Sequence, residues 1–475
     1  MWPRRAAASL AARASSARYM TTARRGMPRV VSVDKIDEVA SAVLRPDSRI
    51  VTAMAVSEPY YFYHNIHRWL EMDSTLTDLK VYCANPNEPV PIFADKNLGE
   101  RIHFTTMFLN HAIRHLQGRR VSYMPHHLST WSENILRAGP INVFWGSCTP
   151  PQENGYVSLG PGCVYETDIM RKADVVILEV NPNIPYVHGS PVIPIESADI
   201  LIDGCTAELQ KLPKAEYDDI DMIIARYVAD LIPDEATIQF GIGGIPNALG
   251  DALLEKRDLG VHTEMINDCL MKLFQSGVVT GKYKSRYPER MVGSFALGTQ
   301  DLYDFMNDNP GVFLVPGRIV NSMEEFSRQH MMHSINTCVE LDLTGQIVSE
   351  SVGHRQLSGV GGAADTHVAA QKSPGGRSII AVRSTSKNGQ SKIVSQLQAG
   401  AKISISRNDV DTVITEYGVA PLKGLSVQER VVVCICLAGF PFSRFQLHLA
   451  CCLAIARPRR TPGATICPHF IPLTH

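Results

Sequence analysis

The chain lacks the sequence signals of several protein classes. It has no Walker-type phosphate-binding loop, no paired CxxC zinc motif and no basic stretch with interleaved aromatic residues. Its net charge of −1, from 46 Lys and Arg against 47 Asp and Glu, gives no electrostatic reason to bind nucleic acid or an acidic membrane. These absences leave a small-molecule enzyme as the default expectation, with no nucleic-acid partner.

Long uninterrupted apolar runs are also missing. The most apolar segment, residues 431–456, contains Pro441 and Arg444, so no membrane span is expected. Six of the eleven cysteines are scattered without the spacing of a disulfide framework and are interpreted as buried free thiols. The other five lie in the last 42 residues, within an atypical Cys-rich tail predicted for residues 431–475.

The first 33 residues have a composition of their own, with seven arginines and no acidic residue before Asp34. An Arg-rich, Ser-rich, acid-poor start without a continuous apolar core is typical of an organelle transit peptide. We therefore expect a mitochondrial transit peptide over residues 1–26 and a mitochondrial matrix location. A disordered basic tail is the alternative interpretation.

The pattern of apolar runs predicts an α/β fold. Buried strands are expected at "SRIVTAMAV", "LKVYCA", "RRVSYM", "INVFWG" and "ADVVILEV", with a helix at "MFLNHAIRHLQ" among them. The same rhythm restarts near residue 213, with helix "DDIDMIIARYVADLI", strand "ATIQFGIG" and helices "NALGDALLEK" and "DCLMKLFQSG". The pattern therefore predicts two similar tandem domains with mostly parallel sheets, at residues 27–210 and 211–430.

The two halves also resemble each other. "ADVVILEVNPNIP" is similar to "INTCVELDLTGQI", and "IESADILIDG" is similar to "SRNDVDTVITEYG". Two related α/β domains that face each other would place ligand sites in the crevice between them.

Two glycine loops could hold an anion. In "TIQFGIGGIPNALGDALLEK", Gly241, Gly243 and Gly244 allow a sharp turn and a close approach of backbone to ligand before a helix N-terminus. The loop "QLSGVGGAADTH" contains Gly361 and Gly362, whose backbone N–H groups could form a nest for an oxyanion. A tight turn without a ligand explains either loop equally simply.

Glu264 ends the expected strand "LGVHTE", at the sheet edge where open α/β folds build their sites. A surface glutamate that favours a helix N-terminus is the plainer explanation. His262 shares a strand face with it, as metal ligands would, but no third ligand has a recognisable spacing and no metal site is predicted.

Taken together, "FGIGGIPNAL", "LGVHTEMINDCL", "SINTCVELDLTGQIVSES", "SGVGGAAD" and "SRNDVDTVITEYGVA" resemble the acetyl-CoA hydrolase/transferase family. The acetate and 4-hydroxybutyrate CoA-transferases of this family are the nearest in pattern. The resemblance covers roughly residues 30–430 and implies a tandem pair of α/β domains. It implies acyl-CoA and small carboxylates as substrates, no tightly bound cofactor, and a homodimer or larger homo-oligomer.

The resemblance also assigns roles to residues. Glu264 would be the nucleophile that attacks an acyl-CoA thioester, forms an acyl anhydride and then a glutamyl-CoA thioester, and passes CoA to a second acid such as succinate. Gly361, Gly362 and Asn336 would stabilise the oxyanion. The loop Gly241, Ile242, Gly243, Gly244 and Ile245 would lie against CoA, with Lys387 as a charge partner.

The sequence departs from the family pattern at Ala53 and Ala55, where relatives tend to have glycine, at Pro421, and after Arg430. Four interpretations remain open at this stage. They are an acetate-type CoA-transferase, an acyl-CoA hydrolase, a sugar-phosphate isomerase on a related scaffold, and a degenerate paralogue that binds CoA without turnover.

Overall fold

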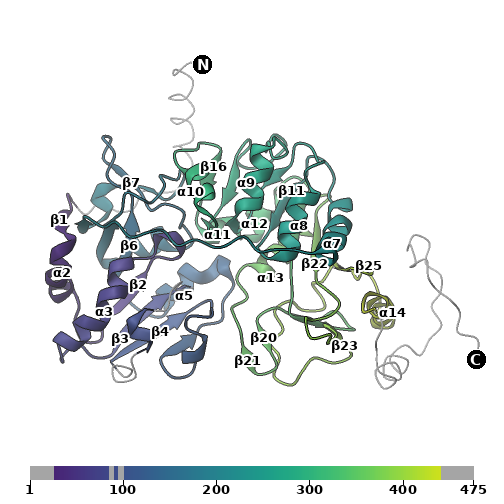
Figure 1. The fold of residues 1–475 in the computed structure, drawn as a ribbon, viewed down its shortest axis with the longest axis horizontal. Helices are drawn as coiled ribbons and strands as arrows, with labels where there is room; N and C mark the ends of the chain where they lie inside the picture. The colour runs from purple at the N-terminus through teal and green to yellow at the C-terminus, as the bar shows by residue number, and fades with distance from the viewer. Residues whose placement is uncertain (1–25, 85–89, 95–100, 440–475) are drawn as a thin grey trace, which may run out of the picture.

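The computed structural model describes residues 26–84, 90–94 and 101–439. The predicted transit peptide, apart from Gly26, and the tail beyond residue 439 lie outside these ranges. Two α/β halves lie side by side along the long axis of the molecule, the first half at the left of Figure 1 and the second at the right.

The first half is built on an eight-stranded sheet in which every neighbouring pair is parallel. In spatial order its strands are β1 (Arg29–Ser32), β10 (Ile200–Asp203), β8 (Ala173–Val180), β6 (Ile141–Cys148), β2 (Arg49–Thr52), β3 (Leu79–Cys83), β4 (Ile102–Thr106) and β5 (Val121–Tyr123). The central strands have almost continuous burial, which is the pattern of a parallel sheet covered on both faces.

Helices cover both faces of this sheet. On one face α2 (Ile36–Val43) and α3 (Tyr60–Met72) pack Val39, Ile66 and Trp69 against strand residues. On the other face α5 (Trp131–Arg137) and α6 (Glu166–Met170) contribute Ile135 and Ile169 to a separate core. The first half therefore has two cores, one on each side of the sheet.

The second half is built on a six-stranded sheet, parallel except for its last pair. Its strands in spatial order are β12 (Gly260–Val261), β11 (Thr237–Phe240), β17 (Met332–Asn336), β22 (Arg377–Ala381), β24 (Thr412–Thr415) and β25 (Gly418–Pro421). One face is covered by α7 (Asp219–Asp230), α8 (Gly244–Ala252) and α9 (Asp268–Gln275). The other face carries α13 (Ala363–Ala370) and α14 (Val427–Leu437).

Five strands have the same order in both sheets. In chain order β2, β3, β6, β8 and β10 correspond to β11, β12, β17, β22 and β24, and they occupy the same sequence of positions across each sheet. The expected tandem pair of mostly parallel α/β domains is confirmed. The counterpart of β8 is β22, however, and not the segment "INTCVELDLTGQI" that the sequence comparison paired with it.

The expected helix over "MFLNHAIRHLQ", residues 107–117, is wrong. The segment forms turns and a single 3₁₀ turn at Arg114–Leu116. The Asn110 side chain accepts a hydrogen bond from the Ala112 N–H at 3.0 Å, a local bond that competes with helix formation. Its apolar residues Leu109 and Ile113 are still buried, so the periodicity reflected burial and not a helix.

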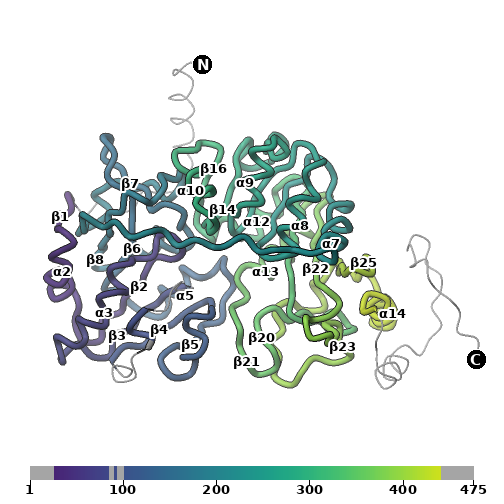
Figure 2. The backbone as a smooth tube through the Cα atoms, viewed as in Figure 1, coloured from purple at the N-terminus to yellow at the C-terminus, as the bar shows by residue number. Residues whose placement is uncertain are grey.

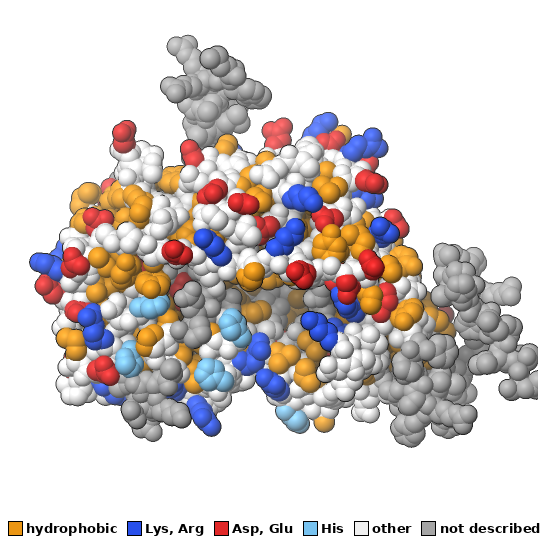
Figure 3. Space-filling model, in the orientation of Figure 1, with side chains coloured by type: hydrophobic (Ala, Val, Ile, Leu, Met, Phe, Trp, Pro, Cys, Tyr) orange, Lys and Arg blue, Asp and Glu red, His pale blue; other side chains and the backbone are white. Residues whose placement is uncertain are grey.

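Part of the predicted tail belongs to the fold. Residues 431–437 continue α14, whose N-terminus is closed by a capping box between Ser426 and Glu429. Cys434 on this helix is buried, and the six scattered cysteines are buried free thiols as expected. In the described part of the chain, no helix is long and apolar enough to cross a membrane. Acidic and basic side chains are interspersed over the face shown in Figure 3.

The two halves are joined by many contacts. Backbone hydrogen bonds cross the junction from Cys163 to Ser294 at 2.9 Å and from Leu128 to Gly361 at 3.0 Å. Arg318 pairs with Asp168 across it at 2.7 Å. Figure 2 shows the segment between β10 and α7 crossing the molecule from one half to the other.

Candidate active site

Glu264 lies at this junction, in the short segment between β12 and β13 (Met265–Ile266). Strand β12 ends at Val261, three residues earlier than the predicted "LGVHTE" strand. The backbone carbonyl of Glu264 accepts hydrogen bonds from the N–H and the hydroxyl of Ser294, at 3.0 and 2.7 Å. The backbone on both sides of the carboxylate is therefore fixed.

The Glu264 side chain has a direct partner in Asn321. The Asn321 amide Nδ2 donates to Glu264 Oε2 at 3.2 Å, while its own Oδ1 is buried and has no hydrogen-bond partner in the described residues. Asn321 is 1% exposed and directly follows the short helix α11 (Gly317–Val320). An amide held this way fixes one oxygen of the carboxylate and leaves the other available.

The second glycine loop closes over the same carboxylate. A Cβ at Gly361 would lie 3.4 Å from Glu264 Oε1, and a Cβ at Gly362 would overlap both Glu264 Oε2 and Asn321 Nδ2. Gly361 has φ +56°, the left-handed region in which glycine is unstrained. Both predicted glycines thus contact Glu264, and their backbone approaches it more closely than a side chain would allow.

The electrostatics of Glu264 favour a carboxyl that titrates near neutrality. The pKa of Glu264 is raised to about 7, first by burial and also by the nearby Asp365 carboxylate. The Asn321 amide and the Gly362 backbone N–H oppose this shift by hydrogen bonding to the charged form. Asp365 is itself held by the N–H and hydroxyl of Ser129, at 3.0 and 2.9 Å, from the other half of the molecule.

Asn336, predicted as an oxyanion donor, lies at the end of β17 and reaches Glu264 only indirectly. Its amide Nδ2 donates to Ser334 and Thr366, at 3.1 and 3.3 Å. Its Oδ1 accepts from Gln239, which in turn accepts from the Thr263 hydroxyl, both at 3.3 Å. Asn336 is therefore connected to the Glu264 segment through a chain of polar side chains.

His262 faces away from this chemistry. Its ring nitrogens pair with the Val320 carbonyl at 2.9 Å and the Gln329 amide at 3.1 Å, and burial lowers its pKa to about 3. The described residues contain no group of three or more side chains that could hold a metal ion. His262 is a neutral core histidine with both nitrogens satisfied.

The first glycine loop and Lys387 line one groove, although they are more than 140 residues apart in the sequence. The groove has a volume of about 790 Å³, within the range of sites for drug-sized ligands. Gly243 has φ +123° at the start of α8, and Ile242 is 46% exposed in the groove wall. Five predicted contacts therefore fall in this groove, namely Ile242, Gly243, Gly244, Ile245 and Lys387.

Charges in the groove are unevenly paired. Arg383 is held by Asp221 at 2.7 Å and by Asp218 at 2.9 Å, and these bonds raise its pKa above its usual range. Lys387 and Lys392 also line the groove, and neither has an ion-pair partner in the described part of the chain. These two lysines are the cations available to an incoming anion.

The groove is connected to Glu264 by two links. The Asn267 side chain, three residues after Glu264, donates to the Gly241 carbonyl at 2.8 Å. Thr337 and Cys338, which follow Asn336, line the groove. A long ligand in the groove would thus lie against the same elements that hold the carboxylate.

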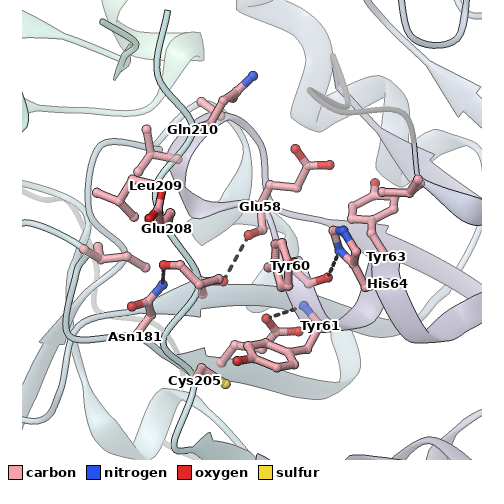
Figure 4. A pocket seen from close by; sticks show the side chains of 17 residues that line it. Glu58, Tyr60, Tyr61, Tyr63, His64, Asn181, Cys205, Glu208, Leu209 and Gln210 are labelled. Carbon is pink, nitrogen blue, oxygen red and sulfur yellow. Dashed lines mark hydrogen bonds between the residues drawn. The ribbon is translucent and has the colours of Figure 1, made fainter. Parts of the chain in front are cut away.

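The first half has a counterpart to this groove with different chemistry (Figure 4). A pocket of about 70 Å³ lies at the equivalent strand ends, where α3 begins. The Glu179 carboxylate accepts from the N–H groups of Tyr61 and Phe62, both at 2.9 Å, and burial raises its pKa to about 8. Glu58 and Glu208 also line it, with no Lys or Arg among its described residues. The helix start that could bind an anion is occupied by Glu179.

Comparison with known proteins shows the family of the chain. Residues 32–230 match the N-terminal domain of acetyl-CoA hydrolase/transferase, and residues 298–449 match its C-terminal domain. The chain belongs to the acetyl-CoA hydrolase/transferase family. The match extends beyond Arg430, where the sequence resemblance was expected to end.

Relatives and solved structures agree with this family. The chain is 34% identical to 4-hydroxybutyrate coenzyme A transferase of Clostridium kluyveri, over 84% of this chain and 93% of that one. It is 33% identical to succinyl-CoA:acetate/propanoyl-CoA:succinate CoA transferase of Fasciola hepatica, over 77% of each chain. Its fold is similar to RipA from Yersinia pestis, with a TM-score of 0.81 and 31% identity, over 89% of this chain and 96% of that one.

These similarities make the chain a CoA-transferase enzyme that uses acyl-CoA as a substrate. The family assignment excludes the isomerase interpretation and favours an active enzyme over a degenerate paralogue. In this CoA-transferase the sequence identified Glu264 and both glycine loops, but it did not identify Asn321 or Asp365. Asn321 is 57 residues from Glu264 in "PGRIVNSM" and has no motif around it. The one sequence signal for Asn321 is that a polar residue directly follows the short apolar pair Ile319 and Val320.

Proposed function

We propose that the protein is an acetate-type CoA-transferase that moves CoA from acetyl-CoA to a carboxylic acid such as succinate. The observation that carries the proposal is the position of Glu264, an ionisable carboxylate between Asn321 and the Gly361–Gly362 backbone, next to a groove of about 790 Å³. A carboxylate nucleophile conserves the thioester energy at each exchange, since each step replaces one activated acyl bond by another.

The reaction begins with attack of the Glu264 carboxylate on the acetyl-CoA carbonyl. The C–S bond breaks, and an acetyl-glutamyl anhydride and CoA thiolate form. The thiolate then attacks the glutamyl carbonyl, which releases acetate and leaves a glutamyl-CoA thioester. Succinate attacks this thioester to give a succinyl-glutamyl anhydride and thiolate, and the thiolate takes the succinyl group and restores the Glu264 carboxylate.

Each predicted residue has a place in this scheme. Gly361 and Gly362 would donate backbone N–H groups to the oxyanion that develops at each attack. Asn336 would act as an additional donor once acyl-CoA displaces part of its present bonding. Ile242, the glycines around it and Lys387 would hold CoA in the groove, with the lysine ammonium near a phosphate.

A pKa near 7 suits this nucleophile. At neutral pH a large fraction of Glu264 is ionised and can attack, whereas a carboxylate that is strongly held by more donors would be less nucleophilic. The Asn321 bond orients the carboxylate without neutralising it.

Succinate is proposed as acceptor because the Fasciola hepatica relative is a succinyl-CoA:acetate/propanoyl-CoA:succinate CoA transferase. The second candidate is an acyl-CoA hydrolase, which the family description also includes. Water instead of a carboxylate would then resolve the Glu264 intermediate.

Product analysis separates these two functions. The purified protein is incubated with acetyl-CoA, with and without succinate, and the CoA species are followed by liquid chromatography. A transferase forms succinyl-CoA with succinate and releases no more than stoichiometric free CoA without it. Sustained release of free CoA without an acceptor, together with no succinyl-CoA, would identify the hydrolase.

We also propose a mitochondrial matrix location and a homodimeric or larger assembly. The Arg-rich, acid-poor composition of residues 1–26 supports the location. Residues 1–26 fused to a fluorescent protein should direct that protein to mitochondria. Fluorescence that stays in the cytosol would contradict the proposed location. Light scattering of the eluting protein measures the assembly, and a monomer mass would contradict it.

A further inference from the structure

A row of basic side chains crosses three neighbouring strands of the first sheet. Arg49 of β2 pairs in register with Lys80 of β3, and Lys80 pairs with His103 of β4. Residues paired across parallel strands about 4.8 Å apart project to the same sheet face. The adjacent cations Arg49 and Lys80 repel each other, so their arrangement destabilises the sheet unless negative charge lies against it.

These three residues line a cavity of about 570 Å³ together with Tyr82, Thr105, Asp78 and Arg119. The cavity is separate from the active site. Arg49 is the first residue of β2, at the amino edge of the sheet, whereas Glu264 lies at the junction near the opposite, carboxyl edge. Strands β3 and β4 lie at the lower left of Figure 1, away from the second half.

Only one of the basic side chains is matched by acids. Lys80 pairs with Asp78 at 3.0 Å and with Asp47 at 3.6 Å. No ion pair to Arg49 or Arg119 occurs in the part of the chain that the structure describes. The lining therefore has more positive than negative charge, even with His103 counted as neutral.

Arg49 provides an independent observation. Its Nε and Nη1 are buried and have no hydrogen-bond partner within the described ranges. The guanidinium lies over the Tyr82 ring, 5.5 Å from its centre, and against Gly139, where a Cβ would meet it. Buried guanidinium donors without acceptors are unfavourable, because the lost hydration is not replaced. These two nitrogens are closed to solvent, so an anion in the cavity would meet Nη2, the one guanidinium nitrogen that is not among them, and would place its negative charge beside the buried group.

We propose that this cavity is a second ligand site, which binds a small oxyanion with two or more negative charges. Arg49 and Arg119 would donate charge-assisted hydrogen bonds to its phosphate or carboxylate oxygens, as guanidinium groups do with both. The Tyr82 ring fixes the Arg49 fork, and the Thr105 hydroxyl is a further polar group in the lining. The site does not depend on the proposed CoA-transfer reaction or its acceptor.

Calorimetric titration of the full chain tests this site. The probes are inorganic phosphate, citrate and succinate, each at constant ionic strength so that general screening is the same in every titration. Arg49→Gln and Arg119→Gln remove one donor group each. Arg137→Gln is the matched control, because Arg137 is a surface arginine with an i,i+4 partner and lies outside the cavity.

Saturable binding of at least one probe is expected, weakened on the order of tenfold by either cavity variant and unchanged in the control. Preference for phosphate or for citrate and succinate decides which oxyanion the site takes. Absence of saturable binding to the natural chain would overturn the proposal, and so would equal affinity in the Arg119→Gln protein. Arg119 is exposed, so this variant keeps the test valid if Arg49→Gln does not fold.

Discussion

The amide nitrogen of Asn321 lies 3.2 Å from Oε2 of Glu264, and the Asn321 side chain makes no other hydrogen bond to the described residues. The amide is buried, so its bond to a charged oxygen is stronger than a neutral hydrogen bond at the surface. Asn321 is therefore a positioning residue, which holds Oε2 of the carboxylate beside Gly362 while Oε1 lies nearer to Gly361.

Replacement of Asn321 by Ala should lower kcat/KM for acetyl-CoA by about 10- to 100-fold, the value of one hydrogen bond to a charged group. The pH profile should change as well. Asn321 lowers the pKa of Glu264, so its removal raises that pKa and moves the rise of activity to higher pH. Steady-state rates across the neutral range measure both effects.

Asn154→Ala serves as the control, because Asn154 is exposed and bonds only the Tyr156 N–H of its own turn. A loss of activity in Asn321→Ala with an unmoved pH profile would mean that the residue supports the fold and does not tune the carboxylate.

Glu264→Gln should make the protein more stable at alkaline pH. The pKa of Glu264 is raised in the folded protein above its value of 4.5 in the unfolded chain. The folded state therefore binds the proton more tightly, and the stability that this proton contributes is lost as pH rises through about 7.

The variant cannot ionise, so its free energy of unfolding should exceed that of the natural protein by about 1–3 kcal/mol at pH 8 and be similar near pH 4. Urea unfolding at both pH values measures the difference. An equal or lower stability of Glu264→Gln at pH 8 would show that the ionised carboxylate is not strained by burial.

Gly362→Ala should abolish most activity, because its methyl group would displace Glu264 and Asn321. A loss of at least about 100-fold in kcat is expected, since misplacement of a reacting group by about 1 Å costs that much. Gly155→Ala is the control, with φ +79° and open space around its Cβ position. In Gly155→Ala the added methyl group meets no neighbour, so the only cost is the positive φ of the backbone, and full activity is expected. Activity within a fewfold of normal in Gly362→Ala would remove the glycine loop from the site.

Lys387→Gln should raise KM for acetyl-CoA several-fold with little change in kcat, because in the proposed role the lysine would bind CoA equally before and during the reaction. The effect should shrink at high salt, as expected for an exposed charge. Lys172→Gln, an exposed lysine outside the groove, is the matched control. A change in kcat alone would place Lys387 nearer to the reacting atoms than the groove does.

Much of the fold followed from burial patterns. Strands β6 and β8 are nearly continuous apolar runs, and α7 and α9 have capping residues at Asp218 and Asn267 that the sequence shows directly. The helix prediction for residues 107–117 was wrong. Its apolar spacing suits a helix, but a hydrogen bond of the Asn110 side chain to the local backbone favours turns. The prediction ended strand β12 three residues too late, because the chain leaves the sheet after Val261 and brings Glu264 to the junction.

The site was only partly predictable, for a physical reason. Glu264 and the two glycine loops lie in local patterns, in which a turn or a strand end has a visible composition. Asn321 and Asp365 act through contacts between segments that are far apart in the chain, and each is an ordinary polar residue in its own surroundings. Lys387 could be named but not placed, since only the folded chain brings it into the same groove as Ile242.

The central claim is that Glu264 becomes covalently bound to CoA. The purified protein is incubated with acetyl-CoA without an acceptor, treated with borohydride and analysed by peptide mass spectrometry. Reduction of the thioester should convert the Glu264 carboxyl to an alcohol in the peptide that contains it, and only when acetyl-CoA is present. An unmodified Glu264 in protein shown to be folded and active would contradict the account.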